Sequence, residues 1–221
     1  MNVLVTGANR GIGLELCRLF IARGHTVTGT ARDPATTGPL RETGATVEIL
    51  DVQRDDAVEA FGAHWGSKPL DVLVNNAGVG AWTPLTQTTT EELLRVFDIN
   101  AVGPLRVTRA LLPALRASRG RVFHITSKMG SIGDTPSGGS YAYRMSKAAL
   151  NMASANLAAD LRPAGVASIV LHPGWVQTDM GGRNAPLTVA ESARSLADLM
   201  ERTGFEATGQ FLNFDGRPIP W

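Results

Sequence analysis

A glycine-rich loop near the N-terminus constrains this chain more than any other feature. The segment Thr6-Gly7-Ala8-Asn9-Arg10-Gly11-Ile12-Gly13 follows a short apolar run and precedes apolar residues of helical period. Glycines at such a place let the backbone turn sharply and approach a pyrophosphate, whose charge meets the free N–H groups of the helix N-terminus. Between a strand and a helix, the loop therefore predicts a dinucleotide-binding unit, and the alternative is a tight turn that binds nothing.

Segments typical of strands and of helices alternate along the rest of the chain. Strands are predicted at Val3–Thr6, Val27–Thr30, Val47–Leu50, Val72–Asn75, Val122–Thr126, Ser168–Leu171 and Gln210–Leu212. Helices are predicted from Ile12 to before Gly24 and near 54–64, 90–117, 142–162 and 189–202, with capping-box sequences at Thr88/Thr89 and Thr188. Because such alternation produces right-handed crossovers, we expect an α/β Rossmann fold, with a doubly wound parallel sheet of about seven strands and helices on both faces.

Length and composition limit the number of domains and the classes of partner. The 221 residues suit a single domain, so we expect residues 1–221 to hold cofactor and substrate sites together. The 21 Lys and Arg residues balance the 20 Asp and Glu residues without a basic cluster, which gives no electrostatic reason to bind nucleic acid or an anionic membrane. No apolar run approaches the ~20 residues that cross a bilayer. The N-terminus enters a strand at once, and a single cysteine fits a reducing compartment. We expect a cytoplasmic protein without a metal site.

The glycine spacing and the motifs after it resemble the short-chain dehydrogenase/reductase family along the whole chain. The loop reads Gly-x-x-x-Gly-x-Gly, Asp51-Val52 follows the third strand, and Asn75-Asn76-Ala77-Gly78 follows the fourth, where the family has its NNAG element. The resemblance implies a nicotinamide cofactor at the carboxyl ends of the strands, which the open α/β architecture also predicts. It assigns cofactor contacts to Gly7, Asn9, Arg10, Gly11, Ile12, Gly13, Asp51, Val52, Asn76, Ala77 and Gly78.

A Pro-Gly turn after the sixth strand extends this resemblance. The segment reads Pro173-Gly174-Trp175-Val176-Gln177-Thr178. In the family the turn and the following threonine close over the nicotinamide carboxamide. The resemblance therefore assigns Pro173 and Gly174 to the cofactor site, together with a backbone contact from Val176 and a hydroxyl contact from Thr178.

The end of the second strand bears on which nicotinamide cofactor is bound. A carboxylate there usually accepts from the ribose 2′-OH of NAD, and the family's NAD users place Asp where this chain has Ala31. Arg32 follows directly, and its guanidinium can pair with a 2′-phosphate, with Arg10 as a second positive charge. Asp33 is interpreted as a turn or N-cap residue before Pro34, and Arg32 could instead be a solvated surface arginine. We favour NADP(H), with NAD(H) as the alternative.

A phenol and an ammonium four residues apart indicate the chemistry. In Tyr143-Arg144-Met145-Ser146-Lys147 the first and last side chains share one helix face, although such pairs also occur by chance. Reduction of a carbonyl needs a hydride at carbon and a proton at the developing alkoxide, and a cation near Tyr143 lowers its pKa. Ser127, at the end of the fifth strand, could donate to the carbonyl oxygen. The resemblance adds Asn100, which holds a water leading from Lys147, and it places Lys147 at the nicotinamide ribose.

Other polar residues near these motifs are given structural roles. Tyr141 has Met145 rather than a lysine four residues later, so we expect it to line the pocket or to pack. His172 is expected to be structural or to support the site, and His124 to be packed in its strand. Cys17 is interpreted as a small buried hydrophobe.

Longer segments resemble a narrower branch of the family, namely Tyr141–Lys147, Leu171–Val176, Thr178–Gly182, Asn213–Gly216 and Pro220-Trp221. The branch holds sniffer-type carbonyl reductases, which implies NADPH-dependent carbonyl reduction. It also holds C-signal (C-factor) proteins, which implies a role in cell–cell signalling. The complete catalytic set favours an enzyme, and the alternative is a cofactor-binding signalling protein with little or no turnover. Sugar-nucleotide epimerases share the Tyr/Lys pair but need a sizeable C-terminal substrate domain.

The expected partners are a small carbonyl compound and a second copy of the chain. Val79–Trp82, Met129–Pro136, Tyr141 and Trp175–Pro186 are the candidate pocket residues, and they are largely apolar or small. They favour a neutral, moderately hydrophobic carbonyl compound. The long helices near 90–117 and 142–162 could pair with their mates to form a homodimer.

Overall fold

A seven-stranded parallel sheet forms the centre of the molecule, with the strand order β3-β2-β1-β4-β5-β6-β7. The computed structural model describes residues 1–221. Its strands are β1 (Asn2–Val5), β2 (Thr26–Ala31), β3 (Thr46–Ile49), β4 (Val72–Asn75), β5 (Arg121–Ile125), β6 (Ala167–His172) and β7 (Phe211–Asn213). The order reverses between β1 and β4, as in a doubly wound fold. All the predicted strands are confirmed, with ends that differ by a residue or so.

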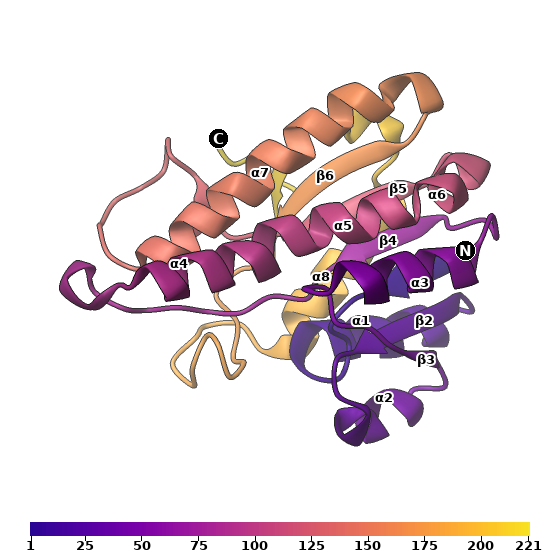
Figure 1. Ribbon diagram of the computed structural model, residues 1–221, viewed down its shortest axis with the longest axis horizontal. Coiled ribbons are helices and arrows are strands. Elements are labelled where there is room, and N and C mark those ends of the chain that lie inside the picture. Colours follow the sequence, from indigo (N-terminus) through magenta and orange to yellow (C-terminus); the bar gives the residue numbers. More distant parts are fainter.

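Two helical layers cover the sheet, as Figure 1 shows. The helices are α1 (Gly11–Ala22), α2 (Gly38–Arg41), α3 (Asp55–Trp65), α4 (Thr90–Phe97), α5 (Gly103–Ala110), α6 (Leu112–Ser118), α7 (Tyr141–Leu161) and α8 (Val189–Arg202). Strand β1 explains the two layers, because Val3 and Val5 belong to the core under α1 and α8, whereas Leu4 belongs to the core under α3, α5 and α6. Side chains that alternate between two buried faces account for the continuous apolar runs of the strands.

The predicted helix near 90–117 is divided into four segments. A π-helical turn, η3 (Asp98–Val102), separates α4 from α5, and α6 begins after Leu111. Pro104 and Pro113 lie in the first turns of α5 and α6, where the missing N–H group does no harm but ends the preceding hydrogen-bond register. The π-helical turn is important for the site because it carries Asn100.

Short helical turns mark the connections between the larger elements. They are η1 (Pro34–Thr36), η2 (Leu85–Gln87), η4 (Lys128–Gly130), η5 (Arg162–Ala164) and η6 (Phe205–Ala207). Asp33 caps η1 by accepting a hydrogen bond from the Ala35 N–H group at 2.9 Å, so its interpretation as an N-cap is confirmed. Thr188 and Glu191 form the predicted capping box of α8. None of the helices has the length and hydropathy needed to cross a membrane.

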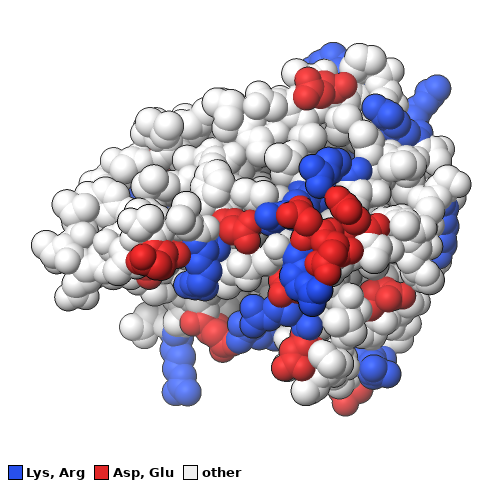
Figure 2. All heavy atoms as spheres, viewed as in Figure 1, with Lys and Arg blue, Asp and Glu red and all other residues white.

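Charged side chains are unevenly distributed over the face drawn in Figure 2. A band of acidic and basic residues crosses the region where α3 and α5 lie, whereas the surface over α7 is nearly free of charge. Several large apolar side chains are exposed on α4, α5 and α7, namely Leu94, Phe97, Leu105, Met145 and Met152.

Candidate active site

Two adjoining cavities open at the carboxyl ends of the strands. The glycine-loop cavity, of about 660 Å³, runs along the loop after β1, the loop after β3 and the segment after β4. The η4 cavity, of about 650 Å³, lies among η4, the start of α7 and the loop after β6. Thr126, Tyr143 and Thr178 line both, so the Tyr143 side chain stands where the cavities meet.

The glycine loop packs directly against the segment after β4. A Cβ atom on Gly7 would lie 2.8 Å from the Ala77 Cα atom, and one on Gly13 would lie 2.4 Å from the Asn76 Nδ2 atom. Asn76 Nδ2 donates to the carbonyl oxygens of Thr6 at 2.9 Å and Gly7 at 3.0 Å. Side chains at Gly7 and Gly13 would therefore force the loop away from β4.

The loop leaves the N-terminus of α1 open to the glycine-loop cavity. Arg10 occupies the N-cap position, and its side chain makes no capping hydrogen bond. The first N–H groups of α1 therefore have no side-chain acceptor, and the helix dipole adds positive potential there. This donor set fits a pyrophosphate, which is the group that the sequence predicts at this position.

The two arginines expected at the 2′-phosphate differ in their surroundings. Arg32 follows β2, is exposed, lines the glycine-loop cavity and takes part in no ion pair. Arg10 pairs with Asp179, which lies after β6, at 2.6 Å, and both side chains are largely exposed. Asp179 therefore competes with a phosphate for the Arg10 guanidinium.

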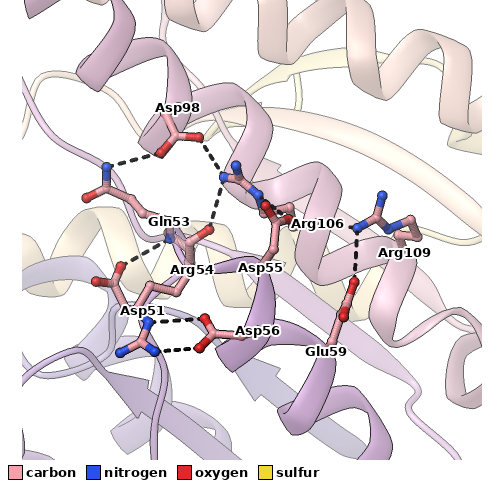
Figure 3. Close-up of polar contacts among 10 residues, drawn as sticks. Asp51, Gln53, Arg54, Asp55, Asp56, Glu59, Asp98, Arg106 and Arg109 are labelled. Atoms are coloured by element: carbon pink, nitrogen blue, oxygen red, sulfur yellow. Dashed lines mark hydrogen bonds and ion pairs between the residues drawn. The ribbon is translucent and has the colours of Figure 1, made fainter. Parts of the chain in front are cut away.

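A network around Arg106 fixes the loop after β3 (Figure 3). Arg106 Nε donates to Asp55 Oδ1 at 2.8 Å, and Nη1 donates to Asp98 Oδ1 at 2.6 Å and to the Val52 carbonyl oxygen at 3.4 Å. Gln53 Nε2 donates to Asp98 Oδ2 at 3.1 Å. Because Val52 and Gln53 line the glycine-loop cavity, α5 and η3 together hold one wall of that cavity.

Asn100 is fully enclosed in η3, and its amide is engaged with protein atoms. Its Oδ1 accepts from the Val79 N–H group at 2.8 Å, while Nδ2 donates to the Val79 carbonyl oxygen at 2.9 Å and to Ser146 Oγ at 3.0 Å. The side chain thus ties the segment after β4 to α7. It lines neither of the two cavities.

Ser127, Tyr143 and Lys147 come together between β5 and α7. A Cβ atom on Gly130 would lie 2.8 Å from the Lys147 Cβ atom, so η4 packs tightly on α7 and brings Ser127 to the same cavity as Tyr143. Lys147 Nζ donates to the Ile125 carbonyl oxygen at 2.8 Å and lies 5.9 Å from the centre of the Tyr143 ring. The indole of Trp82 covers the phenol, with ring centres 5.0 Å apart.

Burial shifts the pKa values of Tyr143 and Lys147. It raises the pKa of Tyr143 to about 12, and the Ser127 hydroxyl opposes the rise by hydrogen bonding. It lowers the pKa of Lys147 to about 8. Lys147 is not among the groups that shift the pKa of Tyr143 in this arrangement, in which the ammonium donates to a backbone carbonyl, so the lowering of that pKa by Lys147 stays a prediction.

The η4 cavity is less apolar than expected. Trp82, Met129, Trp175 and Met180 supply hydrophobic surface, but four ionisable side chains besides Tyr143 also line it, namely Lys128, Asp134, Arg144 and His172. Lys128 Nζ pairs with Asp134 Oδ2 at 2.9 Å. Burial, with a smaller contribution from Lys128, lowers the pKa of His172 to about 4, so that imidazole is neutral at pH 7.

Comparison with known proteins supplies the family. The family described as short chain dehydrogenase matches residues 1–186. The chain belongs to this family. It is 48% identical to C-signal of Myxococcus xanthus over 166 residues, which are 74% of this chain and 100% of that protein.

Solved structures of other short-chain dehydrogenases share the whole fold. Carbonyl reductase Sniffer of Drosophila melanogaster has 32% sequence identity and a TM-score of 0.94, and the match covers 100% of this chain and 99% of that chain. An NADPH-bound carbonyl reductase from chicken fatty liver has 31% identity and a TM-score of 0.93, with 100% and 98% covered. The resemblance to the family and to its sniffer and C-signal branch is therefore confirmed.

Most of the cofactor-binding residues expected from the short-chain dehydrogenase motifs line the glycine-loop cavity. The exceptions are Gly174 and Val176, which line the η4 cavity. Tyr141 lines neither cavity and is exposed, so the expectation that it lines the pocket or packs is wrong. His124 and Cys17 are fully buried, as predicted.

Sequence reasoning missed Arg144, Lys128 and His172 as lining residues of the η4 cavity. Each lies next to a recognised motif residue, Arg144 after Tyr143, Lys128 after Ser127 and His172 before Pro173. That adjacency was the available signal, because a neighbour of a site residue shares its cavity whenever the backbone itself forms the wall.

Proposed function

We propose that this short-chain dehydrogenase is an NADPH-dependent carbonyl reductase, with both sites within residues 1–221. The observation that carries the proposal is the position of Tyr143, where the two cavities meet, with Ser127 and Lys147 beside it. The glycine-loop cavity is assigned to the cofactor and the η4 cavity to the carbonyl compound. The carbonyl reductases with the same fold support this assignment.

NADPH, when bound, supplies the hydride for the carbonyl carbon. Ser127 donates a hydrogen bond to the carbonyl oxygen and polarises it. Tyr143 then donates its proton to the developing alkoxide, and a phenol with a pKa of about 12 is fully protonated at neutral pH.

Lys147 and Asn100 complete the proposed site. Lys147 would hold the nicotinamide ribose hydroxyls and, as a mostly protonated group at neutral pH, would return a proton to Tyr143. Asn100 would support the proton path towards solvent by fixing Val79 and Ser146 around it. Its part is positional, because its amide is already fully hydrogen-bonded within the chain.

The preference for NADP(H) over NAD(H) rests on the second strand. Buried Ala31 offers no carboxylate to a ribose, and Arg32 is free to pair with a 2′-phosphate. Arg10 becomes a second ligand once it leaves Asp179. The NADPH bound to the chicken carbonyl reductase supports the same choice. NAD(H) remains the alternative and would bind without these two contacts.

Substitution of Tyr143 by Phe tests the catalytic assignment. We expect NADPH to quench tryptophan fluorescence as in the wild type, while turnover with quinones, aldehydes, ketones and diones falls by about 100-fold or more. Tyr141→Phe is the matched control, since that tyrosine lines neither cavity. Unchanged turnover in Tyr143→Phe would remove Tyr143 from the mechanism.

A cofactor-binding signalling protein is the second candidate, favoured by the 48% identity to C-signal. Wild-type protein that binds NADPH but reduces no compound of the panel would support it over the reductase. Retention of Ser127, Tyr143 and Lys147 around one cavity favours the reductase, because a protein that only binds has no need of a proton donor at that place.

A homodimer is also proposed. The exposed apolar side chains Leu94, Phe97, Met145 and Met152 lie on α4 and α7, which pack against each other, and the charged band lies away from α7 (Figure 2). Pairing of these helices with those of a second copy would cover that surface. Sedimentation that shows only monomer at micromolar concentration would contradict it.

A further inference from the structure

Arg144 is the uncompensated positive charge of the η4 cavity. Of the four ionisable groups that line it, Lys128 and Asp134 neutralise each other in an ion pair at 2.9 Å. His172 is neutral at pH 7, since its pKa is lowered to about 4. Arg144 has no carboxylate within ion-pair distance, so the cavity carries the net charge of its guanidinium.

The guanidinium of Arg144 is also short of hydrogen-bond acceptors. Its Nη1 donates to the Met129 carbonyl oxygen at 3.5 Å and its Nη2 to Ser137 Oγ at 3.2 Å. Its Nε is enclosed and has no partner. An arginine has five N–H donors that suit a planar, two-oxygen acceptor, so two long bonds to neutral groups leave most of this capacity unused.

The other partly buried arginines of the chain have carboxylate or backbone carbonyl acceptors at short distances. Arg23 pairs with Asp198 and Glu201 at 2.6 Å each, and Arg106 pairs with Asp55 and Asp98. Arg121 has no carboxylate partner but donates to two backbone carbonyl oxygens at 2.9 and 2.8 Å. Arg144 has no carboxylate partner and only one backbone carbonyl partner, at 3.5 Å, and it lines the cavity that adjoins the proton donor.

We propose that Arg144 binds a carboxylate of the substrate, so that the preferred carbonyl compounds are oxo acids with an apolar body. This inference rests on the proposed reductase function. The indoles of Trp82 and Trp175 and the side chain of Met180 accommodate the apolar body. The Lys128 ammonium is already paired with Asp134, which leaves Arg144 as the unpaired cation for a carboxylate. A single guanidinium suits a monoanion, whereas a phosphate dianion would call for several cationic donors.

The position of Arg144 in α7 also lets it orient the bound substrate for reaction. It follows Tyr143 directly, so a carboxylate held by the guanidinium leaves the other end of the compound free to reach the phenol and Ser127. Anchoring a remote group in this way improves the orientation of the reacting carbonyl. The neutral compound expected from the sequence would lack this anchor.

A matched pair of aldehydes tests the proposal. 4-Formylbenzoate and its methyl ester present the same reactive carbonyl and ring but differ in charge. We expect wild-type kcat/KM with NADPH to favour the acid by about 10- to 100-fold, as for a charged hydrogen bond in a shielded site. Arg144→Gln should bring this ratio close to 1, and Arg144→Lys should retain part of the preference.

Arg183→Gln is the matched control for net charge. Arg183 is exposed in the loop after β6 and lines neither cavity, so its removal should leave the acid-to-ester ratio unchanged. Circular dichroism and thermal unfolding establish that each variant is folded. Equal losses for acid and ester in Arg144→Gln would make Arg144 a structural clamp between Met129 and Ser137 and would overturn the proposal.

Failure of the inference and failure of the reductase function are distinguishable. Reduction of the ester without preference for the acid overturns the role of Arg144 alone. If wild-type protein reduces neither aldehyde nor any compound of the panel of quinones, aldehydes, ketones and diones, the reductase proposal fails, and calorimetric titration of the NADPH-loaded protein with the two aldehydes decides on the carboxylate site. Tighter binding of the acid that disappears in Arg144→Gln supports the site, and equal binding of acid and ester overturns it.

Discussion

Replacement of Arg106 by Gln should weaken cofactor binding from a distance. The Arg106 side chain is only 15% exposed and bridges Asp55, Asp98 and the Val52 carbonyl oxygen. The substitution removes the cation from between two carboxylates and releases the loop after β3 from α5 (Figure 3). We expect both lower stability and a less well-defined wall of the glycine-loop cavity.

The expected loss of stability in Arg106→Gln follows from the exposure of its two carboxylate partners. Asp98 is 30% exposed and Asp55 is 61% exposed, so the network lies between a surface pair and a buried one. Loss of one partner costs about 0–1 kcal/mol at the surface and about 3–5 kcal/mol in the interior, which places Arg106→Gln near 2 kcal/mol. For a chain of this length that corresponds to a fall in Tm of about 4–8 °C.

Two measurements and one control separate the effect on stability from the effect on cofactor binding. Thermal unfolding reports stability, and fluorescence titration with NADPH should show a dissociation constant raised by about 3- to 10-fold, with kcat at saturating cofactor little changed. Arg109→Gln is the control, because Arg109 is 66% exposed and lies 3.9 Å from its carboxylate partners. Loss of stability without loss of NADPH affinity would refute a positioning role, and identical behaviour of the two variants would refute the network itself.

The remaining predictions concern the cofactor loop, the phosphate contact and pH. Gly13→Ala should abolish NADPH binding and destabilise the fold by about 1–3 kcal/mol, because the new Cβ atom would lie 2.4 Å from Asn76 Nδ2; calorimetric and unfolding measurements check this. Arg32→Ala should raise the KM for NADPH by about 10-fold and leave that for NADH nearly unchanged, and an equal effect on both would contradict the 2′-phosphate contact. The urea midpoint of unfolding should decrease as the pH is lowered from 6.5 to 4. The pKa of His172 is about 4 in the folded chain but near 6.5 when unfolded, so the unfolded state binds more protons in that range. A His172→Gln variant with the same pH slope would contradict this origin.

The strands and the glycine loop could be predicted because local sequence determines them. Parallel strands buried on both faces need uninterrupted apolar runs, and the loop needs glycine wherever a Cβ atom would strike the segment after β4. The long helix near 90–117 was harder, since Pro104 and Pro113 are acceptable in a first helical turn and only the structure shows where each turn begins.

The pKa values of the site residues and the net charge of the η4 cavity could not be predicted from the sequence. The sequence shows that Lys147 shares a helix face with Tyr143, but the direction of the Tyr143 pKa shift depends on how deeply the folded chain buries the phenol. Likewise, Arg144 is an ordinary helical arginine until the ion pair of Lys128 with Asp134 leaves it as the net charge. Both properties depend on distant segments that meet only in the folded chain.

The ion pair between Arg10 and Asp179 has a consequence for the order of binding. It joins residues 169 positions apart, and Asp179 lies in a loop that is bonded internally through Trp175 Nε1 to the Gly181 carbonyl oxygen and through the Gly181 N–H group to Thr178 Oγ1. A 2′-phosphate that takes Arg10 would untie this loop, which also borders the η4 cavity. Binding of NADPH would then loosen the loop that borders the η4 cavity. NADH lacks the 2′-phosphate and would leave the ion pair between Arg10 and Asp179 in place. Substrate affinity measured with the two nucleotides should therefore differ.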